Sequence, residues 1–330
     1  MIRRFCSTSA KFIKPIQSRS EFELPINVER KKWYPKHMSI QMAKMEGRLR
    51  SVDLVVEVHD ARVPFTGRNP VFRDRLFTVR PHILVLNKRD LIDMEKYRIP
   101  VEEQLRSEGV NCVLWTDCKK KTKRALDDLT KMMIQCLQSD FRFNRTVKAE
   151  YQVMVVGIPN CGKSSLINGL RTLTMDKKKN AVKEGARPGV TVRLQNRVRI
   201  MDKPLMYILD TPGVLNPYVR TVEENMKLGL CENVLESTLN MESVSDYLLY
   251  WLNKQQDYSY LKALNLEGQP TDDIRELLTR ICQKNNLVHS INIPGKGHFD
   301  RWNYKAAIEM FLKIFRKREL DDCFLDKDKL

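Results

Sequence analysis

Short apolar runs rich in β-branched residues alternate with segments of helical periodicity over the first two thirds of the 330-residue chain. This alternation is typical of an α/β domain built around a mostly parallel sheet. The helix-like segments include Val101–Ser107 and Lys123–Leu137. The expected strands are Asp53–Val58, His82–Leu86, Asn111–Trp115, Gln152–Val156 and Leu205–Leu209.

Near Pro217 the pattern changes to helices without strands. Val244–Leu252, Asp272–Cys282 and Lys305–Arg318 each carry an apolar stripe at helical spacing, which indicates one buried face. We therefore expect an α/β domain over residues 21–220 and a small all-α domain over residues 221–330. No stretch approaches the roughly 18 consecutive apolar residues of a membrane-spanning helix.

Charge is distributed unevenly between these two parts. The whole chain has a formal net charge of +17, of which residues 1–220 carry +20 and residues 221–330 carry −3. Basic runs stand at Arg30–Lys32, Lys119–Lys121 and Lys177–Lys179. This excess favours a polyanionic partner, either a nucleic acid or an anionic membrane surface. The eight cysteines form no Cys-x-x-Cys pair, which argues against a zinc site and a disulfide scaffold.

The first twenty residues have their own composition. They hold five basic residues and no acidic ones, and they are rich in serine and threonine. This is typical of a mitochondrial transit peptide, so we assign residues 1–20 to one and expect a location in the mitochondrial matrix. The alternative is a disordered basic arm that binds nucleic acid directly.

Gly157–Ser164 reads G-x-x-x-x-G-K-S and lies between an expected strand and the helical segment Ser165–Leu170, the context a phosphate-binding loop requires. Glycines in such a loop let successive backbone N–H groups surround phosphates at a helix N-terminus. Lys163 should reach the β- and γ-phosphates, and Ser164 should ligate Mg²⁺. The expected phosphate-binding residues are Asn160, Cys161, Gly162, Lys163, Ser164 and Ser165.

A second motif, Asn87-Lys88-Arg89-Asp90, follows the apolar run His82–Leu86. The Asp90 carboxylate can accept two N–H bonds from guanine N1 and N2, a bidentate match that adenine does not offer. Asn87 would bond the other edge of the purine, and Lys88 would lie along its ring. Together with the phosphate-binding loop, this motif predicts GTP or GDP as the ligand.

A third motif, Asp210-Thr211-Pro212-Gly213, follows the last expected strand. Asp210 would hold Mg²⁺ through water, and the Gly213 N–H would sense the γ-phosphate. Thr191, between the phosphate-binding loop and this motif, is suited to complete the Mg²⁺ shell when a switch loop closes.

The order of the motifs identifies a family. Ordinary GTPases place N-K-x-D and the base loop last, whereas here N-K-x-D and the expected base loop Thr116-Asp117-Cys118 precede the phosphate-binding loop. The same sheet can be built from either order if the termini are moved within a surface loop. The sequence resembles the circularly permuted GTPases that assist ribosome assembly, in particular their mitochondrial large-subunit branch. The resemblance runs from about Trp33 to Arg318 and rests on Trp33–Met38, Asp60–Pro64, Arg68–Pro70, Arg187–Thr191 and Gly295–Arg318.

This resemblance implies a source for the catalytic help that the motifs lack. Val214 follows Gly213 where many small GTPases carry a water-orienting glutamine, and an apolar side chain cannot orient water. In the family, the histidine that maps onto His37 is implicated in hydrolysis; the alternative is a histidine satisfied by local hydrogen bonds. The family also implies a K⁺ ligand at Asn160. Asp60 and Arg62 receive no role from the sequence.

The resemblance further implies a GTP-hydrolysing switch that binds ribosomal RNA of the mitochondrial large subunit and leaves after hydrolysis. We expect RNA contacts to be shared between the helical domain, near Lys313 and Arg316–Arg318, and the basic α/β surface. We expect a monomer off the ribosome, and peripheral contact with the inner membrane is a further expectation. The D-x-x-G motif would act on the helical domain through the linker near Pro217. The rivals are a nucleotide-insensitive RNA-binding scaffold and a P-loop ATPase acting elsewhere.

Overall fold

The computed structural model describes residues 15–24, 36–72, 80–120, 123–139, 150–175, 197–215, 221–234, 239–293 and 297–330. The chain divides into two compact units. The first, called the sheet unit, comprises residues 24–244, 316–318 and 322–330. The second, called the helical unit, comprises the residues up to 23 together with 245–315 and 319–321. This division places the main boundary near residue 244, whereas the sequence pattern predicts it near 220.

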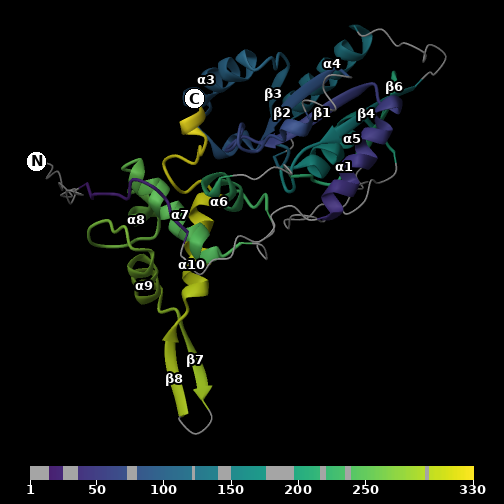
Figure 1. The fold of residues 1–330 in the computed structure, drawn as a ribbon. Coiled ribbons are helices and arrows are strands. Elements are labelled where there is room, and N and C mark those ends of the chain that lie inside the picture. Colours follow the sequence, from purple (N-terminus) through teal and green to yellow (C-terminus); the bar gives the residue numbers. More distant parts are fainter. Residues whose placement is uncertain are drawn as a thin grey trace, which may run out of the picture. The chain divides into compact units, whose positions relative to one another are not determined.

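The sheet unit is built on a six-stranded sheet with the order β3-β2-β1-β4-β6-β5 (Figure 1). All neighbouring strands are parallel except the edge strand β5, which runs antiparallel to β6. The strands are β1 Leu54–Asp60, β2 His82–Asn87, β3 Val113–Trp115, β4 Glu150–Val156, β5 Val198–Asp202 and β6 Leu205–Asp210. The α/β prediction with a mostly parallel sheet is confirmed, and the short edge strand β5 is an addition to the five strands expected.

Helices pack on this sheet through the apolar faces that their sequence pattern predicts. In α4, the stripe formed by Leu126, Leu129 and Met133 is fully buried, and α4 and α5 pack on each other and on the strands. The helices of this unit are α1 Lys36–Arg48, α2 Pro70–Phe72, α3 Met94–Ser107, α4 Lys123–Ser139, α5 Lys163–Met175 and α6 Val222–Leu230, with single 3₁₀ turns at Leu49–Ser51, Arg89–Leu91 and Lys327–Lys329.

Helix α3 begins earlier than its predicted start at Val101 and contains Pro100 in its first half. The Asp93 side chain caps it by accepting hydrogen bonds from the backbone N–H groups of Glu95 and Lys96. Pro100 lies in the second turn, where the loss of one N–H costs a hydrogen bond but leaves the cap intact. The cap therefore fixes the start of this helix.

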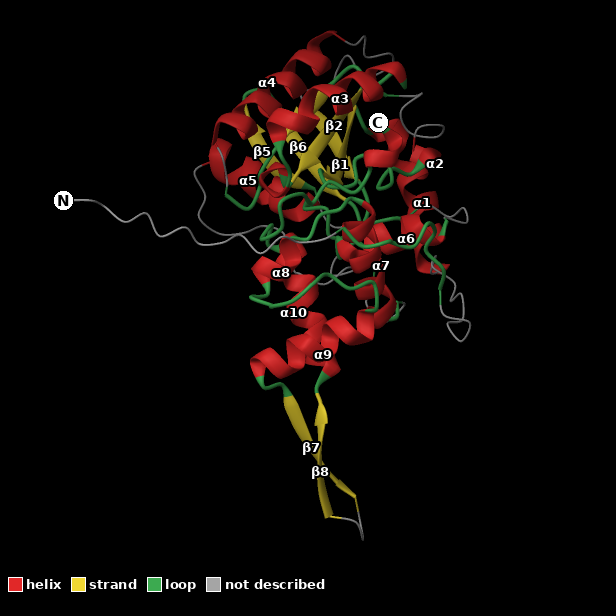
Figure 2. Cartoon of the chain, turned by 90° about the vertical axis from the view of Figure 1, so that its left-hand side faces the viewer, coloured by secondary structure: helices red, strands yellow, loops and turns green. Residues whose placement is uncertain are grey.

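The helical unit contains α7 Met241–Lys254, whose first turn belongs to the sheet unit, together with α8 Ser259–Ala263, α9 Ile274–Asn285 and α10 Tyr304–Arg316. Its core includes the fully buried rings of Tyr247, Tyr260, Phe311 and Phe315. The prediction of a purely α-helical domain is wrong in one respect, because β7 Val288–Ile293 and β8 Gly297–Trp302 form an antiparallel hairpin between α9 and α10. Figure 2 shows this hairpin extending away from the two helices.

A segment from the predicted transit peptide packs on the helical unit. The Arg19 guanidinium donates to both oxygens of Asp246, at 2.8 and 3.1 Å, and its Nε lies 3.2 Å from Asp272 Oδ2. Phe22 is buried against Tyr247 and Tyr250, with ring centroids 5.1 and 5.7 Å apart. The folded core of this unit thus begins inside the region assigned to targeting, which the sequence pattern does not reveal.

The C-terminal residues return to the sheet unit. Asp326 is fully buried and accepts hydrogen bonds from the backbone N–H groups of Phe65 and Thr66 and from the Thr66 hydroxyl. Phe324 stacks on Tyr97 of α3, with ring centroids 4.2 Å apart. These contacts tie the end of the chain to the loop after β1. Within the described part of the chain, no helix has the length and apolar character needed to cross a membrane.

Candidate functional site

The loops that carry the predicted motifs meet at one edge of the sheet. β1, β2, β3, β4 and β6 are parallel, so their carboxyl ends lie along the same edge. In open α/β sheets, ligands bind in the crevice outside these carboxyl ends. The permuted order of the motifs therefore does not separate them in space.

The phosphate-binding loop follows β4 directly and leads into α5. Gly157 and Gly162 have φ values of 147° and 105°, backbone conformations that residues other than glycine rarely adopt. The buried Lys163 ammonium donates to the carbonyl oxygens of Gly157 and Ile158, at 3.3 and 2.8 Å. The lysine expected to meet the β- and γ-phosphates is thus held across the concave side of its own loop.

Asn87 joins this loop to the two base-recognition segments. Its Nδ2 donates to the Cys161 carbonyl at 2.9 Å, and its Oδ1 accepts from the Cys118 N–H at 3.0 Å and from the Thr116 hydroxyl at 3.2 Å. A Cβ at Gly162 would lie 2.1 Å from Asn87 Nδ2, so only glycine permits this approach. The prediction gives Asn87 a purine contact, whereas in the structure its amide is engaged by three loop residues and retains only a second Nδ2 proton.

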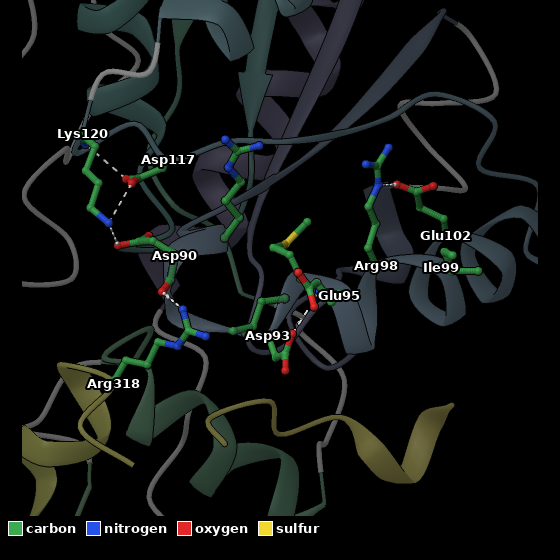
Figure 3. A pocket seen from close by; sticks show the side chains of 12 residues that line it. Asp90, Asp93, Glu95, Arg98, Ile99, Glu102, Asp117, Lys120 and Arg318 are labelled. Atoms are coloured by element: carbon green, nitrogen blue, oxygen red, sulfur yellow. Dashed lines mark hydrogen bonds and ion pairs between the residues drawn. The ribbon is translucent and has the colours of Figure 1, made fainter. Parts of the chain in front are cut away.

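Asp90 and Asp117 line one wall of an open cavity of about 1010 Å³ (Figure 3). The Lys120 ammonium lies between them, 3.4 Å from Asp90 Oδ2 and 3.7 Å from Asp117 Oδ2. Arg318 donates to the Asp90 carbonyl at 2.7 Å. The carboxylate expected to bind guanine therefore lines a cavity, and the ammonium of Lys120, whose side chain is 68% exposed, lies beside it.

Asp210 has the surroundings of a metal ligand. Its side chain is fully buried, and neither carboxylate oxygen has a hydrogen-bond partner. Burial raises the pKa of Asp210 to about 6. The Lys163 charge offsets this only in part, as do the Ser164 hydroxyl and the Thr211 N–H, which lie near the carboxylate without hydrogen-bond geometry. A buried carboxylate without partners fits Mg²⁺, which takes one or two protein oxygens together with phosphate and water. Ser164, which begins the first turn of α5, would supply the hydroxyl ligand, while Thr191 lies outside the described residues.

The segment after Asp210 packs on the phosphate-binding loop. A Cβ at Gly213 would lie 2.5 Å from the Pro159 backbone, so this contact also requires glycine. The Val214 N–H donates to the Gly157 carbonyl at 3.2 Å. The segment expected to sense the γ-phosphate is therefore in direct contact with the phosphate-binding loop.

Two of the segments that carry the family resemblance, Trp33–Met38 and Arg68–Pro70, hold Leu215, the residue that follows Val214. The Leu215 N–H donates to Met38 Sδ at 3.5 Å, and Asn69 Nδ2 donates to the Leu215 carbonyl at 3.2 Å. His37 immediately precedes Met38 near the start of α1, although its own side chain lies outside the described part of the structure. The backbone of the predicted catalytic histidine is thus joined through its neighbour to the end of the D-x-x-G segment.

Comparisons with known proteins agree with this geometry. Residues 152–290 match the family model described as 50S ribosome-binding GTPase. The chain is 39% identical to mitochondrial ribosome-associated GTPase 1 of Ictalurus punctatus over 297 residues, covering 89% of this chain and 92% of that protein. It belongs to the mitochondrial ribosome-associated GTPase 1 family.

More distant relatives extend the comparison. Ribosome biogenesis GTPase A of Bacillus cereus is 31% identical over 299 residues, covering 87% of this chain and 90% of that protein. The crystal structure of GNP-bound YlqF from T. maritima superposes with a TM-score of 0.52 at 21% identity, covering 85% of this chain and 98% of that one. This likeness supports the permuted GTPase fold, and membership of a GTP-hydrolase family confirms the enzyme class that the motifs predict.

A loop that no sequence motif marks supports the phosphate-binding loop of this GTPase. Asn233 Nδ2 donates to the Pro159 carbonyl at 2.8 Å, and Asn160 Nδ2 lies 3.4 Å from the Glu232 carbonyl. Asn160 itself has a φ of 54°, and Glu232 forms an ion pair with Arg316 at 3.1 Å. The loop after α6 thus contacts two phosphate-loop residues. Its only sequence signal is the Glu-Asn pair at a helix end.

Proposed function

We propose that this protein is a GTP-hydrolysing switch that binds ribosomal RNA of the mitochondrial large subunit and dissociates after hydrolysis. The main support is the side chain of Asn87 in N-K-x-D, which hydrogen-bonds both to the phosphate-binding loop and to the base loop. A single guanosine nucleotide can then contact Lys163 through its phosphates and Asp90 through its base. This arrangement argues against the rival ATPase, because an adenine ring does not offer Asp90 two N–H groups.

Each motif residue has a distinct task in hydrolysis. Lys163 would leave the Gly157 and Ile158 carbonyls and bind phosphate oxygens, with Asn160, Cys161, Gly162 and Ser165 contributing from the loop. Ser164, Asp210 and Thr191 would hold Mg²⁺, which offsets the negative charge that develops on the transferred phosphoryl group. Asn160 is also the residue to test for K⁺ binding.

His37 is the proposed catalytic residue. Val214 is fully buried and apolar, so the position after Gly213 supplies no group that orients water. The Met38–Leu215 hydrogen bond supports a place for His37 beside the γ-phosphate sensor. His37 would orient the attacking water, and His37→Ala should lower kcat without weakening GDP binding.

The hairpin of the helical unit is the proposed RNA contact of that unit. Residues 284–305 contain four basic residues and one acidic residue, whereas the rest of residues 221–330 contains 11 basic and 17 acidic residues. Trp302 and Val288, paired across the hairpin, are 36% and 42% exposed, and Arg301 beside them is exposed. Unpaired bases stack on aromatic rings while arginine binds phosphate, so this surface fits single-stranded RNA.

The expected setting follows from the family and the charge. The protein would act in the mitochondrial matrix as a monomer off the ribosome, with the large subunit as its partner. Peripheral contact with the inner membrane is a further expectation. The basic runs at residues 30–32 and 177–179 lie outside the described residues, while Lys119 and Lys120 are exposed on the sheet unit.

Sedimentation with mitochondrial ribosomal subunits tests the switch. We expect the tagged protein to migrate with the large subunit in a non-hydrolysable GTP analogue and to be released in GDP. Lys163→Ala should abolish this nucleotide dependence. Lys262→Ala, which removes one exposed charge from α8, is the matched control and should behave as the wild type. Equal co-sedimentation of wild type and Lys163→Ala in both nucleotides would instead support the nucleotide-insensitive scaffold.

A further inference from the structure

The motif Asp60-Ala61-Arg62 gains a role from its position in the sheet. Asp60 ends β1 and is paired in register with Asn87, which ends the adjacent strand β2. The Ala61 N–H also donates to the Asn87 carbonyl at 2.8 Å. The carboxylate therefore stands directly beside the N-K-x-D loop, although the two segments are far apart in the sequence.

The Asp60 side chain is fully buried and binds two cations. Arg62 donates from Nε to Oδ1 at 2.9 Å and from a terminal nitrogen to Oδ2 at 2.7 Å, while the Lys88 ammonium lies 2.9 Å from Oδ2. Burial alone would raise the pKa of Asp60, but the charges of Arg62 and Lys88 outweigh it and hold that pKa below its usual range. The carboxylate is therefore ionised at any pH at which the protein works.

We propose that Asp60 is a positioning residue for the nucleotide site: it anchors the ammonium of Lys88 so that the lysine's aliphatic stem lies against the purine ring. This rests on the proposed function, with Lys88 lying along the purine ring as its motif predicts. Lys88 adopts a φ of 62°, an uncommon backbone conformation, and its ammonium is held 2.9 Å from Asp60 Oδ2. Arg62 supports Asp60 and is itself buried, with one terminal nitrogen 3.4 Å from the Cys231 carbonyl.

The physical gain is preorganisation. A lysine stem has four rotatable bonds, and holding its end before the ligand arrives reduces the entropy lost on binding. An ammonium that points away into a buried carboxylate also presents only methylene groups to the ring. Loss of the anchor should therefore weaken binding of guanine nucleotides without altering the hydrolytic step.

The test compares two variants that differ only in the anchor. Arg62→Met removes one cation but leaves the Asp60–Lys88 pair, whereas Asp60→Asn combined with Arg62→Met removes the carboxylate without leaving a buried arginine unpaired. By isothermal titration with GDP, we expect Arg62→Met to bind within about threefold of the wild type and the double variant to bind about tenfold more weakly than Arg62→Met. The KM for GTP should rise by a similar factor while kcat at saturation stays constant.

A cycle with Lys88→Met separates positioning from a structural role. In the Lys88→Met background, the Arg62→Met variant and the Asp60→Asn, Arg62→Met double variant should bind GDP equally, because the ammonium that Asp60 anchors is gone. A difference that persists, or equal GDP binding by the two variants with Lys88 present, overturns the proposal. If thermal unfolding shows that both Arg62 variants fail to fold, Asp60→Glu provides the test, because it keeps the charge but shifts the carboxylate by one methylene. Asp60→Glu should lower GDP affinity in the protein that has Lys88 and leave it unchanged in the Lys88→Met background. Failure of the wild type to bind GDP would overturn the proposed function itself.

Discussion

At the scale of single residues, the site depends on side chains whose partners come from other loops. Asn87 is the clearest case, because one carboxamide satisfies a carbonyl of the phosphate-binding loop and two donors of the base loop. Buried polar groups that lose such a partner cost about 1–3 kcal/mol each. The conformation of all three loops is therefore coupled to this one residue, which explains how motifs in permuted order are held next to one another.

Asp210 provides a prediction about pH and metal. Its pKa in the folded protein is about 6, above the value of 3.8 for an unperturbed aspartate, so the folded state favours the protonated form. The ionised form destabilises the metal-free protein above pH 6, and this loss disappears as the pH falls toward 4. Asp210→Asn should therefore stabilise the metal-free protein by about 1–3 kcal/mol at pH 7.5 and much less at pH 4.5.

Thermal unfolding with and without Mg²⁺ and GDP measures this effect. The wild type should gain stability from Mg²⁺ at pH 7.5, and Asp210→Asn should not. Asp202→Asn, the same change at an aspartate whose side chain is 59% exposed, is the control and should leave both responses intact. A metal-free Asp210→Asn protein that is less stable than the wild type at pH 7.5 would contradict the assignment.

At the scale of elements, the two surprises are the N-terminal segment and the β7–β8 hairpin. In the N-terminal segment, Arg19 pairs with Asp246 of α7 and with Asp272 just before α9, whose side chains are 14% and 20% exposed. Removing the segment would leave two neighbouring carboxylates without their cation. The segment is thus part of the folded helical unit, whether or not it also serves in targeting.

Arg19→Ala should destabilise the helical unit by about 1 kcal/mol, a modest value because the arginine is one-third exposed and solvent screens its pairs. Urea unfolding measures the change, and adding Asp246→Asn should recover part of it. Lys262→Ala is the charge-matched control.

N-terminal sequencing of the imported protein should find a first residue before Ile16, because the Ile16 N–H donates to the Tyr258 hydroxyl in the folded helical unit. A mature chain that begins after Arg19 with unchanged stability would contradict this account.

Much of this architecture could be predicted from the sequence, for identifiable reasons. The strands of the parallel sheet are apolar runs next to nucleotide motifs, so β1, β2, β4 and β6 are found within two residues of their predicted positions. Helix α1 was not predicted, although Met38, Met42, Met45 and Leu49 are buried at helical spacing.

Other features could not be predicted, since their cause is not local. The hairpin packs on no sheet and shows no simple alternation of apolar and polar residues, so its pattern resembles a loop. The role of Asp60 depends on its register opposite Asn87, and the support of Pro159 by Asn233 joins residues 74 positions apart. Such contacts become visible only when the strands are assembled.

At the scale of the whole molecule, basic and acidic residues are distributed unevenly along the chain. The helical part of the sequence is net acidic, yet the hairpin and its flanks are basic and carry exposed Trp302. This removes the apparent conflict between an acidic C-terminal part and an RNA partner. RNA binding by a few basic side chains depends steeply on salt, because counterions are released from phosphate.

A double variant of the hairpin, Arg301→Ala with Trp302→Ala, should weaken binding to single-stranded ribosomal RNA about tenfold and reduce the slope of log affinity against log salt by about one unit. Fluorescence anisotropy with labelled RNA at several salt concentrations measures both. Lys262→Ala should change neither by as much. Unchanged RNA binding, together with lost binding to anionic vesicles, would assign the hairpin to a membrane surface instead.

The central claim is that two motifs encoded in permuted order recognise one guanosine nucleotide, and calorimetric titration of the purified protein with GDP, ADP and XDP tests it most directly. The account predicts one GDP site per chain and little binding of ADP. It also predicts that Asp90→Asn moves preference from GDP to XDP, while Asp93→Asn, which keeps the helix cap three residues away, leaves it unchanged. Equal affinity for GDP and ADP, or an Asp90→Asn protein that still prefers GDP, would contradict it.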